Sequence, residues 1–149
     1  MTSADTNLFV YAADPGAPLH AAARQFFAAA TRDTEHEFVV CELVMIELYM
    51  QLRNAAVFDR PHSAAEATAY VEGVKTRTGW RHIDYDPAIS GKLWHWAKSA
   101  EMSGFRQIID ARLALTLRHH GVTRFATANP KHFQGFGFSE VWNPLTAAR

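Results

Sequence analysis

The sequence has little of the chemistry that cross-links a chain, anchors it in a membrane or extends it into a fibre. Cys41 is the one cysteine among 149 residues, which excludes an internal disulfide and a cysteine-built zinc site and fits the reducing cytoplasm. No stretch approaches the roughly 20 apolar residues of a membrane helix, and the first residues lack the basic segment of a secretory signal. Eight glycines and six prolines exclude collagen-like and low-complexity chains. We therefore expect a cytoplasmic protein without membrane contact.

A net charge of either sign is also lacking, because 15 basic residues balance 15 acidic ones. The balance is uneven along the chain. Residues 1–40 hold five acids and two bases, a net charge of −3, and residues 104–131 hold five bases and one acid, a net charge of +4. Neutrality disfavours coating of nucleic acid by the whole surface, whereas the second segment leaves open either a local basic face or an ordinary solvated helix.

The composition is that of an ordinary globular protein, with 48% hydrophobic and 20% charged residues, and the length predicts one domain over 1–149. Cap and turn signals divide it into alternating helices and strands. We expect helices over 17–30, 42–54, 64–77, 87 to about Met102 and 107–120, and strands over 2–4, 38–41, 80–85, 122–127 and 140–142. This order predicts an α/β sandwich around a mainly parallel sheet, with ligands beyond the carboxyl ends of the strands.

Two of these helices carry local end signals. Ser63 followed by Glu66 predicts a capping box at the start of the helix over 64–77. Gly121 predicts a left-handed cap at the end of the helix over 107–120.

Two carboxylates lie inside the apolar stripes of their helices. Leu43, Ile46, Glu47 and Met50 follow the i, i+3, i+4, i+7 spacing of one helix face, so Glu47 is expected on a buried face. Asp110 lies within a second stripe, formed by Ile109, Leu113, Ala114 and Leu117. A buried carboxylate must be paired, protonated or bound to a metal, because an unpaired buried charge is very costly.

Asp5 follows the first predicted strand directly and adds a third acid near the same sheet edge. Asp5, Glu47 and Asp110 around a water-filled cleft would suit Mg²⁺ or Mn²⁺, which prefer oxygen ligands. Such a site can bind a phosphodiester and activate water. Carboxylate clusters also occur in phosphatases and in structural ion pairs, and both alternatives stay open. Glu42 lies about 140° from Glu47 around the helix and is expected to act only on the helix dipole.

Other catalytic patterns are missing from the sequence. It contains no H-E-x-x-H, G-x-S-x-G, G-x-G-x-x-G or G-x-x-x-x-G-K-[ST] motif. We expect most of the eight histidines at the surface, and the four tryptophans in the core or at a dimer interface.

Four segments together resemble the motifs of PIN-domain nucleases. They are Asp5-Thr6-Asn7 with the following Leu8–Ala12, Glu47 in IELYMQLRN, Asp110 in IIDARLALTLRHHG, and the closing run FATANPKHFQGFGFSEVWNP. Each segment alone is weak, but four in this order and spacing, over residues 4–145, are specific. The segment NAAVFDRPHSAAEA further resembles VapC-type toxins of VapBC toxin–antitoxin systems, especially the mycobacterial group.

The resemblance implies a three-layer sandwich with a mainly parallel sheet and a Mg²⁺- or Mn²⁺-dependent endoribonuclease that cleaves tRNA- or rRNA-like targets. It also implies a VapB-like antitoxin that blocks the cleft, a homodimer, and operator binding by the complex through the antitoxin. Carried over residue by residue, Asp5, Glu47 and Asp110 would be the metal ligands. The side chains of Thr6, Asn7 and Thr127 would orient these carboxylates.

The fourth acidic position of the family is altered here. Many members carry an aspartate where residues 127–133 read Thr-Ala-Asn-Pro-Lys-His-Phe. Asn129 can still contribute an amide oxygen to catalysis, but the lost charge favours one metal in the free protein and a second recruited with the phosphate. We expect Arg112 and Lys131 or His132 to neutralise RNA phosphates.

Two other functions compete with this prediction. A phosphatase of the haloacid-dehalogenase type would carry D-x-D-x-T after the first strand, and Asp5-Thr6-Asn7 lacks its second aspartate. A catalytically silent domain that only binds a partner is conceivable because Asn129 and His132 are neutral. Metal binding and RNA cleavage distinguish the three.

Overall fold

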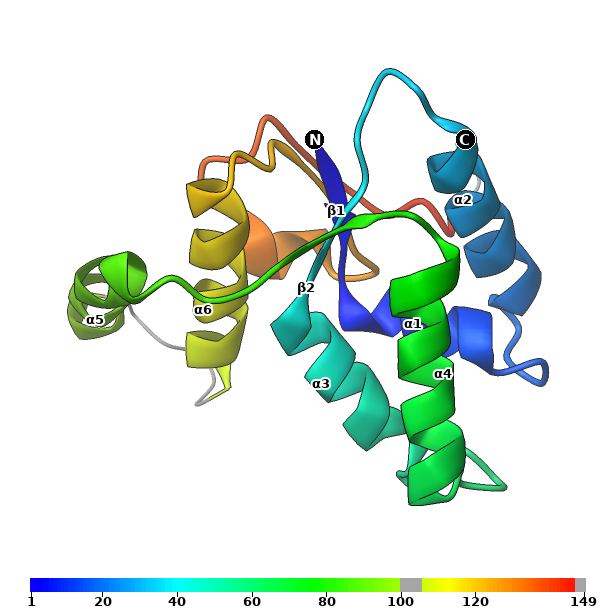
Figure 1. Ribbon diagram of the computed structural model, residues 1–149. Helices are drawn as coiled ribbons and strands as arrows, with labels where there is room; N and C mark the ends of the chain where they lie inside the picture. Colours follow the sequence, from blue (N-terminus) through cyan, green and yellow to red (C-terminus); the bar gives the residue numbers. More distant parts are fainter. Residues whose placement is uncertain (100–105, 147–149) are drawn as a thin grey trace.

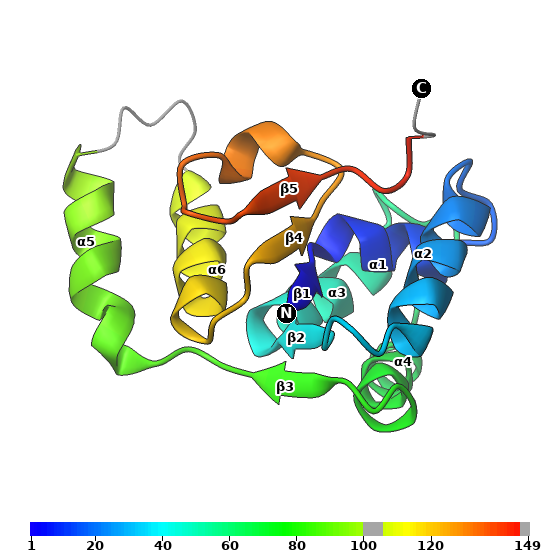
Figure 2. The same cartoon turned by 90° about the horizontal axis from the view of Figure 1, so that it is seen from above.

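The computed structural model describes residues 1–99 and 106–146 and shows five short parallel strands. These are β1 (Thr2–Ala4), β2 (Val39–Cys41), β3 (Arg81–Ile83), β4 (Arg124–Ala126) and β5 (Glu140–Trp142). β1 pairs with β4 and β4 with β5, while β2 pairs with β3. A parallel bridge between Thr2 and Phe38 joins the two sets, so that the strands run in the order β3-β2-β1-β4-β5 across the molecule (Figure 2). The predicted parallel sheet is confirmed, and each strand is only three residues long.

Helices flank this sheet on both sides. They are α1 (Thr6–Ala13), α2 (His20–Arg32), α3 (Glu42–Leu52), α4 (Ala64–Arg77), α5 (Ser90–Ser99) and α6 (Gln107–His119), with 3₁₀ turns at Pro87–Ile89 and Pro130–Phe133. α6 and α5 lie on one side, and α2 and α4 lie on the other (Figures 1 and 2). α1 and α3 begin directly where β1 and β2 end, which brings their first turns to the carboxyl edge of the sheet. No helix in the described ranges is long and apolar enough to cross a membrane.

The predicted helix ends are largely confirmed. Glu66 N donates to Ser63 Oγ at 3.2 Å and Ser63 N to Glu66 Oε2 at 2.8 Å, which forms the capping box. Gly121 has φ +83°, the left-handed conformation that glycine adopts without strain, so the predicted cap is confirmed. The predicted helix after Asp86 begins with one 3₁₀ turn, and its expected end at Met102 lies outside the described residues.

The first helix, α1, was not expected from the sequence. It has eight residues, and its middle is apolar on every side, so it shows no helical period. Asp5 begins it by accepting a hydrogen bond from Thr6 N at 2.7 Å. Helix α2 starts at His20, three residues later than predicted.

The predicted buried stripe of α3 is wrong. Ile46 is 52% and Met50 58% exposed, and Glu47 is half-buried at a cavity rather than in the core. The buried face of the helix consists of Val44, Met45, Leu48 and Leu52. Apolar residues surround most of α3, so several registers fit its spacing equally well, and packing against α1 and α4 decides between them.

The predicted buried stripe of α6 and the predicted core position of the tryptophans are each confirmed in part. Leu113 and Leu117 are buried as predicted, but Ile109 is 37% exposed. Trp80 packs in an aromatic cluster with ring centroids 4.5 Å from Phe38 and 6.3 Å from Phe9. Trp94 lies outside the core with 63% exposure.

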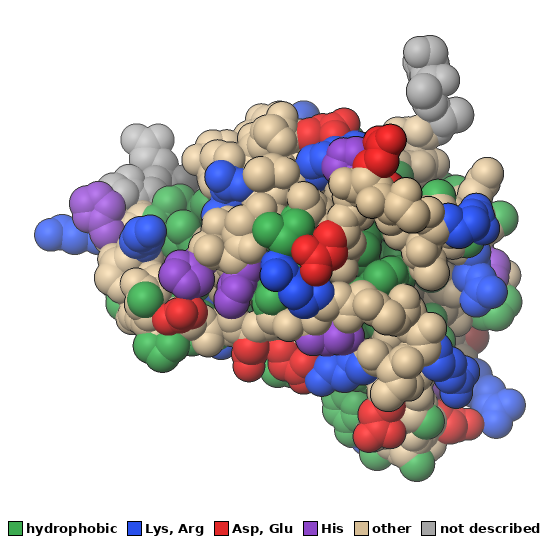
Figure 3. All heavy atoms as spheres, turned by 45° about the horizontal axis from the view of Figure 1, so that its top comes forward, with side chains coloured by type: hydrophobic (Ala, Val, Ile, Leu, Met, Phe, Trp, Pro, Cys, Tyr) green, Lys and Arg blue, Asp and Glu red, His purple; other side chains and the backbone are tan. Residues whose placement is uncertain are grey.

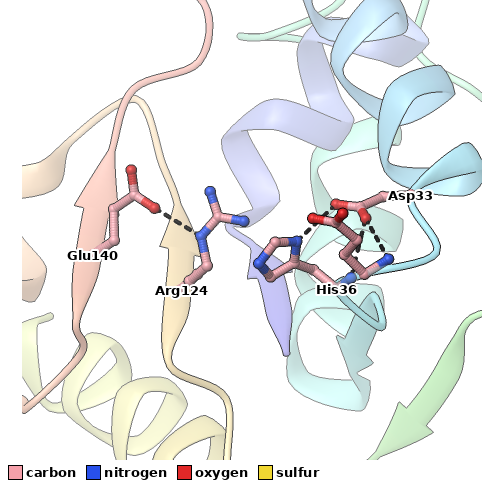
Figure 4. A network of polar contacts seen from close by, with 5 residues as sticks. Asp33, His36, Arg124 and Glu140 are labelled. Atoms are coloured by element: carbon pink, nitrogen blue, oxygen red, sulfur yellow. Dashed lines mark hydrogen bonds and ion pairs between the residues drawn. The ribbon is translucent and has the colours of Figure 1, made fainter.

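Charged groups at the edge where the strands begin are paired with one another. Arg124 Nε lies 2.7 Å from Glu140 Oε2 and joins β4 to β5, and His36 Nδ1 lies 3.1 Å from Asp33 Oδ2 in the turn after α2 (Figure 4). Acidic, basic and histidine side chains are intermixed over this side of the molecule (Figure 3). The acids singled out by the sequence lie at the opposite edge.

The register of α3 makes a testable difference to stability. Leu48→Ala removes a fully buried side chain and is expected to lower the free energy of unfolding by about 2–5 kcal/mol. Ile46→Ala, two residues away on the opposite, exposed face of α3, is expected to change it by less than about 1 kcal/mol. Urea denaturation measures both. Equal losses for the two variants would contradict the observed register.

Candidate active site

The carboxyl edge of the sheet holds a cavity of about 460 Å³ that we call the acidic cavity. Asp5 enters it from the end of β1, Glu47 from α3 and Asp110 from the first turn of α6. Asn129 and Arg106 also line it. Three carboxylates from segments far apart in the sequence are thus brought into one space, as the sequence predicts.

Asp5 is fixed by the strand end on which it sits. Its backbone N–H donates to Ala126 O at 2.9 Å, which continues the pairing of β1 with β4 by one residue. Its Oδ1 accepts from Thr6 N at 2.7 Å. Burial raises the pKa of Asp5 to about 6. Hydrogen bonds from Thr127 and Thr6 stabilise the carboxylate and oppose this rise, whereas the negative charges of Glu47 and Asp110 add to it.

Thr127 and Asn7 lock the ends of β1 and β4 together around Asp5. Thr127 Oγ1 donates to Asp5 Oδ2 at 2.6 Å, and Asn7 Nδ2 donates to the same oxygen at 2.7 Å. Thr127 Oγ1 also accepts from Asn129 N at 3.0 Å, and Asn7 Oδ1 accepts from Ala128 N at 3.1 Å. Thr127 is fully buried. The segment after β4 is therefore held against Asp5, with Asn129 at the cavity.

Glu47 is oriented from α1. Thr6 Oγ1 donates to Glu47 Oε2 at 2.8 Å, which links the first turn of α1 to the middle of α3. Burial raises the pKa of Glu47, and the negative charge of Asp110 adds to the rise. The hydrogen bond from Thr6 and the positive charge of Arg106 oppose it.

Asp110 faces a different partner, since His132 Nδ1 lies 3.3 Å from Asp110 Oδ2. Burial raises the pKa of Asp110, and His132 opposes this.

The donor set fits a hard divalent cation, although its side chains are not gathered around one point. In residues 1–99 and 106–146 no three His, Cys, Asp or Glu side chains form a ready metal-binding group. Both Asp5 oxygens are held by protein donors, and Asp110 turns toward His132. Neither Asp5, Glu47 nor Asp110 forms an ion pair with lysine or arginine within the described ranges, which argues against a purely structural ion-pair cluster. A cation that drew Glu47 and Asp110 inward would relieve their repulsion.

The basic residues lie partly elsewhere than predicted. Arg112 does not line the acidic cavity, because its guanidinium carbon lies 4.6 Å from the centroid of the Tyr85 ring. Two positions after Asp110 on a helix correspond to a turn of about 200°, which points it away. Lys131 and His132 are exposed on the 3₁₀ turn after Asn129.

Sequence reasoning missed Arg106 and Gln51 among the polar residues that line this cavity. Arg106 lines the cavity from the start of α6, and Gln51 lines it from α3. Both signals were available, because Arg106 precedes Asp110 by four residues and Gln51 follows Glu47 by four, which places each pair on one helix face.

The raised pKa of Asp5 gives the metal-free protein a definite pH dependence. The folded pKa of about 6 exceeds the ordinary value of 3.8, so the folded state binds the proton more tightly. Stability is therefore lost as pH rises from 3.8 to 6, by up to about 3 kcal/mol. In EDTA, the free energy of unfolding of the wild type should fall across this window relative to that of Asp5→Asn, as urea denaturation at each pH would show. Parallel curves for the two proteins would refute the assignment.

Comparison with known proteins places this geometry in a family. A family model described as PIN domain matches residues 4–138. The sequence is 40% identical over 147 residues, 99% of each chain, to ribonuclease VapC24 in two strains of Mycobacterium tuberculosis.

Solved structures share the fold at lower identity. M. tuberculosis VapC20, described as a toxin that cleaves the sarcin–ricin loop, has a TM-score of 0.63 and 16% identity over 84% of this chain and 87% of its own. FitAB bound to an IR36 DNA fragment has a TM-score of 0.64 and 14% identity over 100% and 99%. FitAcB from Neisseria gonorrhoeae has a TM-score of 0.62 and 18% identity over 97% and 98%. The predicted three-layer α/β fold is confirmed, and the chain belongs to the PIN-domain family, among the VapC ribonucleases.

Proposed function

We propose that this protein is a VapC-type toxin that cleaves RNA phosphodiester bonds with the help of Mg²⁺ or Mn²⁺ and is neutralised by a cognate antitoxin. The family supports the ribonuclease activity, since the 40% identical relative is named a ribonuclease. The observation that carries the metal dependence is the acidic cavity. Three partly desolvated carboxylates share it without a lysine or arginine ion pair in the described chain, and a hard cation is the partner that this donor set lacks.

Each residue of the site has a proposed role. Asp5, Glu47 and Asp110 would hold the cation, which when bound would activate water and stabilise charge on the phosphodiester. Thr6 would hold Glu47, and Thr127 with Asn7 would hold Asp5, so that the carboxylates keep their directions.

The same residues limit the number of metals. Asn129 lines the acidic cavity and offers a neutral amide oxygen where many family members carry an acid. We therefore propose that the free protein holds one metal ion and that a second enters only with the RNA phosphate.

RNA would approach over the side of the acidic cavity that carries Arg106, the arginine that lines it. Lys131 and His132 are exposed nearby, on the turn that places His132 against Asp110, and would neutralise further phosphates. We propose a single-stranded or loop target in tRNA or rRNA, because proteins read sequence from unstacked RNA bases. The relative that cleaves the sarcin–ricin loop supports a loop target.

The partners are proposed on the same basis. We propose a VapB-like antitoxin that covers the acidic cavity, a homodimeric toxin, and a complex that binds operator DNA through the antitoxin. The likeness to FitAB, which was solved bound to a DNA fragment, supports the last point. A cytoplasmic location and a single domain over 1–149 stay predictions.

A catalytically silent binding domain is the second candidate, favoured by the neutral Asn129 and by the lack of a ready three-ligand group among the described residues. A haloacid-dehalogenase phosphatase is less suited, because Asn7 stands at its second acidic position and uses its amide to hold Asp5 and Ala128.

Cleavage of end-labelled cellular RNA by antitoxin-free protein tests the proposal. Wild type with Mn²⁺ or Mg²⁺ should give discrete fragments that vanish in EDTA. Asp110→Asn should lower the rate at least about 100-fold, because it removes a charged ligand of the metal. Asp33→Asn, which changes an exposed acid at the opposite sheet edge, should cleave like wild type. Unchanged cleavage by Asp110→Asn would refute the assignment, and intact RNA under every metal condition would favour the silent domain.

A further inference from the structure

A second cavity, of about 380 Å³, adjoins the acidic cavity. Glu47, Gln51, Arg106 and Asp110 line both, so the two are parts of one continuous depression between α3 and α6. The remaining walls of the second cavity are aliphatic: Leu43, Ile46, Met50 and Ile109. One half of the depression is thus acidic and the other half apolar.

The apolar walls are not required by the core. Ile46 and Met50 are more than half exposed, and Ile109 is also exposed, whereas the buried face of α3 points elsewhere. A contiguous group of exposed aliphatic side chains generally indicates a binding surface. Its position beside the proposed catalytic carboxylates indicates that what lies in the acidic cavity also reaches this wall.

Two polar side chains lie where the halves meet. Arg106 brings a planar cation with five N–H donors, and Gln51 brings an amide with both donors and an acceptor. The Gln51 amide has no hydrogen-bond partner in the described parts of the chain. The second cavity therefore combines apolar walls, one cation and one amide that no described protein group occupies.

We propose that this second cavity is a nucleobase pocket, which receives an unstacked base of the nucleotide next to the phosphate that is cleaved. The inference rests on the proposed ribonuclease function and assigns the part of the site that selects the RNA. A base has two flat apolar faces and a polar edge, which match the aliphatic walls and the Gln51 amide. The Arg106 guanidinium can stack on a base or pair with the adjoining phosphate, which offsets the charge of the carboxylates.

Binding can be measured without catalysis. Methyl NMR signals of Ile46, Ile109 and Met50 should shift saturably when nucleoside monophosphates are added in EDTA, and inorganic phosphate should not move them. The methyl group of Met45, which is buried in the core, is the internal control. Unmoved signals, or equal shifts with inorganic phosphate, would overturn the proposal. Signals that change with protein concentration alone would also overturn it, because they would assign the wall to a second copy.

Cleavage of a random-sequence single-stranded RNA pool gives the second readout. Wild type should prefer certain bases at one position beside the cut. Ile46→Ser and Gln51→Leu should reduce that preference about tenfold at this position only. Trp94→Ala, which removes an exposed apolar side chain outside the site, should leave it unchanged.

The two proposals fail separately. If both variants cleave RNA with an unaltered base preference, the base pocket is refuted and the ribonuclease activity is supported. The aliphatic wall would then be assigned to a protein segment. If nucleotides shift the Ile46 methyl signal but no metal-dependent cleavage occurs, the base pocket is supported and the proposed catalysis is refuted.

Discussion

The confinement of three carboxylates to one cavity is the constraint on which the rest of the site depends. Asp5, Glu47 and Asp110 are partly removed from water, and burial raises the pKa of each. A fold gains nothing from such an arrangement by itself, since desolvation and mutual repulsion both oppose it. The proposed cation would offset both costs, and the hydrogen bonds from Thr6, Asn7 and Thr127 hold carboxylate oxygens of Glu47 and Asp5 in place for it.

The short strands serve this arrangement. Each strand has three residues, and the segments directly after the strands carry the proposed site residues: Asp5 after β1, the helix with Glu47 after β2, and Thr127 to Asn129 after β4. At the opposite edge the charges of Asp33, His36, Arg124 and Glu140 are paired with one another (Figure 4). The carboxylates without a lysine or arginine partner thus lie at one edge of the sheet, where the proposed chemistry takes place.

The sequence predicted the parts of the fold that depend on local chemistry or on strand–helix alternation. The capping box at Ser63, the left-handed Gly121 and the convergence of Asp5 with Glu47 and Asp110 all follow from residue type and order. α1 and the register of α3 could not be predicted, because both helices are apolar on nearly every side. The spacing of their apolar residues therefore does not show which face is buried.

Roles of individual site residues were harder to predict than their positions. The hydrogen bonds that tie Thr127 to Asp5 join residues 122 positions apart, so they follow from tertiary structure alone. The sequence predicts Arg112, two positions from Asp110, near the RNA phosphates, whereas Arg106, four positions from Asp110, lines the cavity. The same four-residue spacing links Glu47 to Gln51 and joins the acidic cavity to the apolar wall.

Anomalous diffraction from a crystal soaked in Mn²⁺ tests the central claim most directly, because it locates the metal independently of any RNA. The account predicts a single strong peak in the acidic cavity, about 2 Å from carboxylate oxygens of at least two of Asp5, Glu47 and Asp110, with the Asp110 side chain moved toward it. A crystal with no peak in this cavity at saturating Mn²⁺, or with its peak at another group of residues, would contradict the claim that these carboxylates form a metal site.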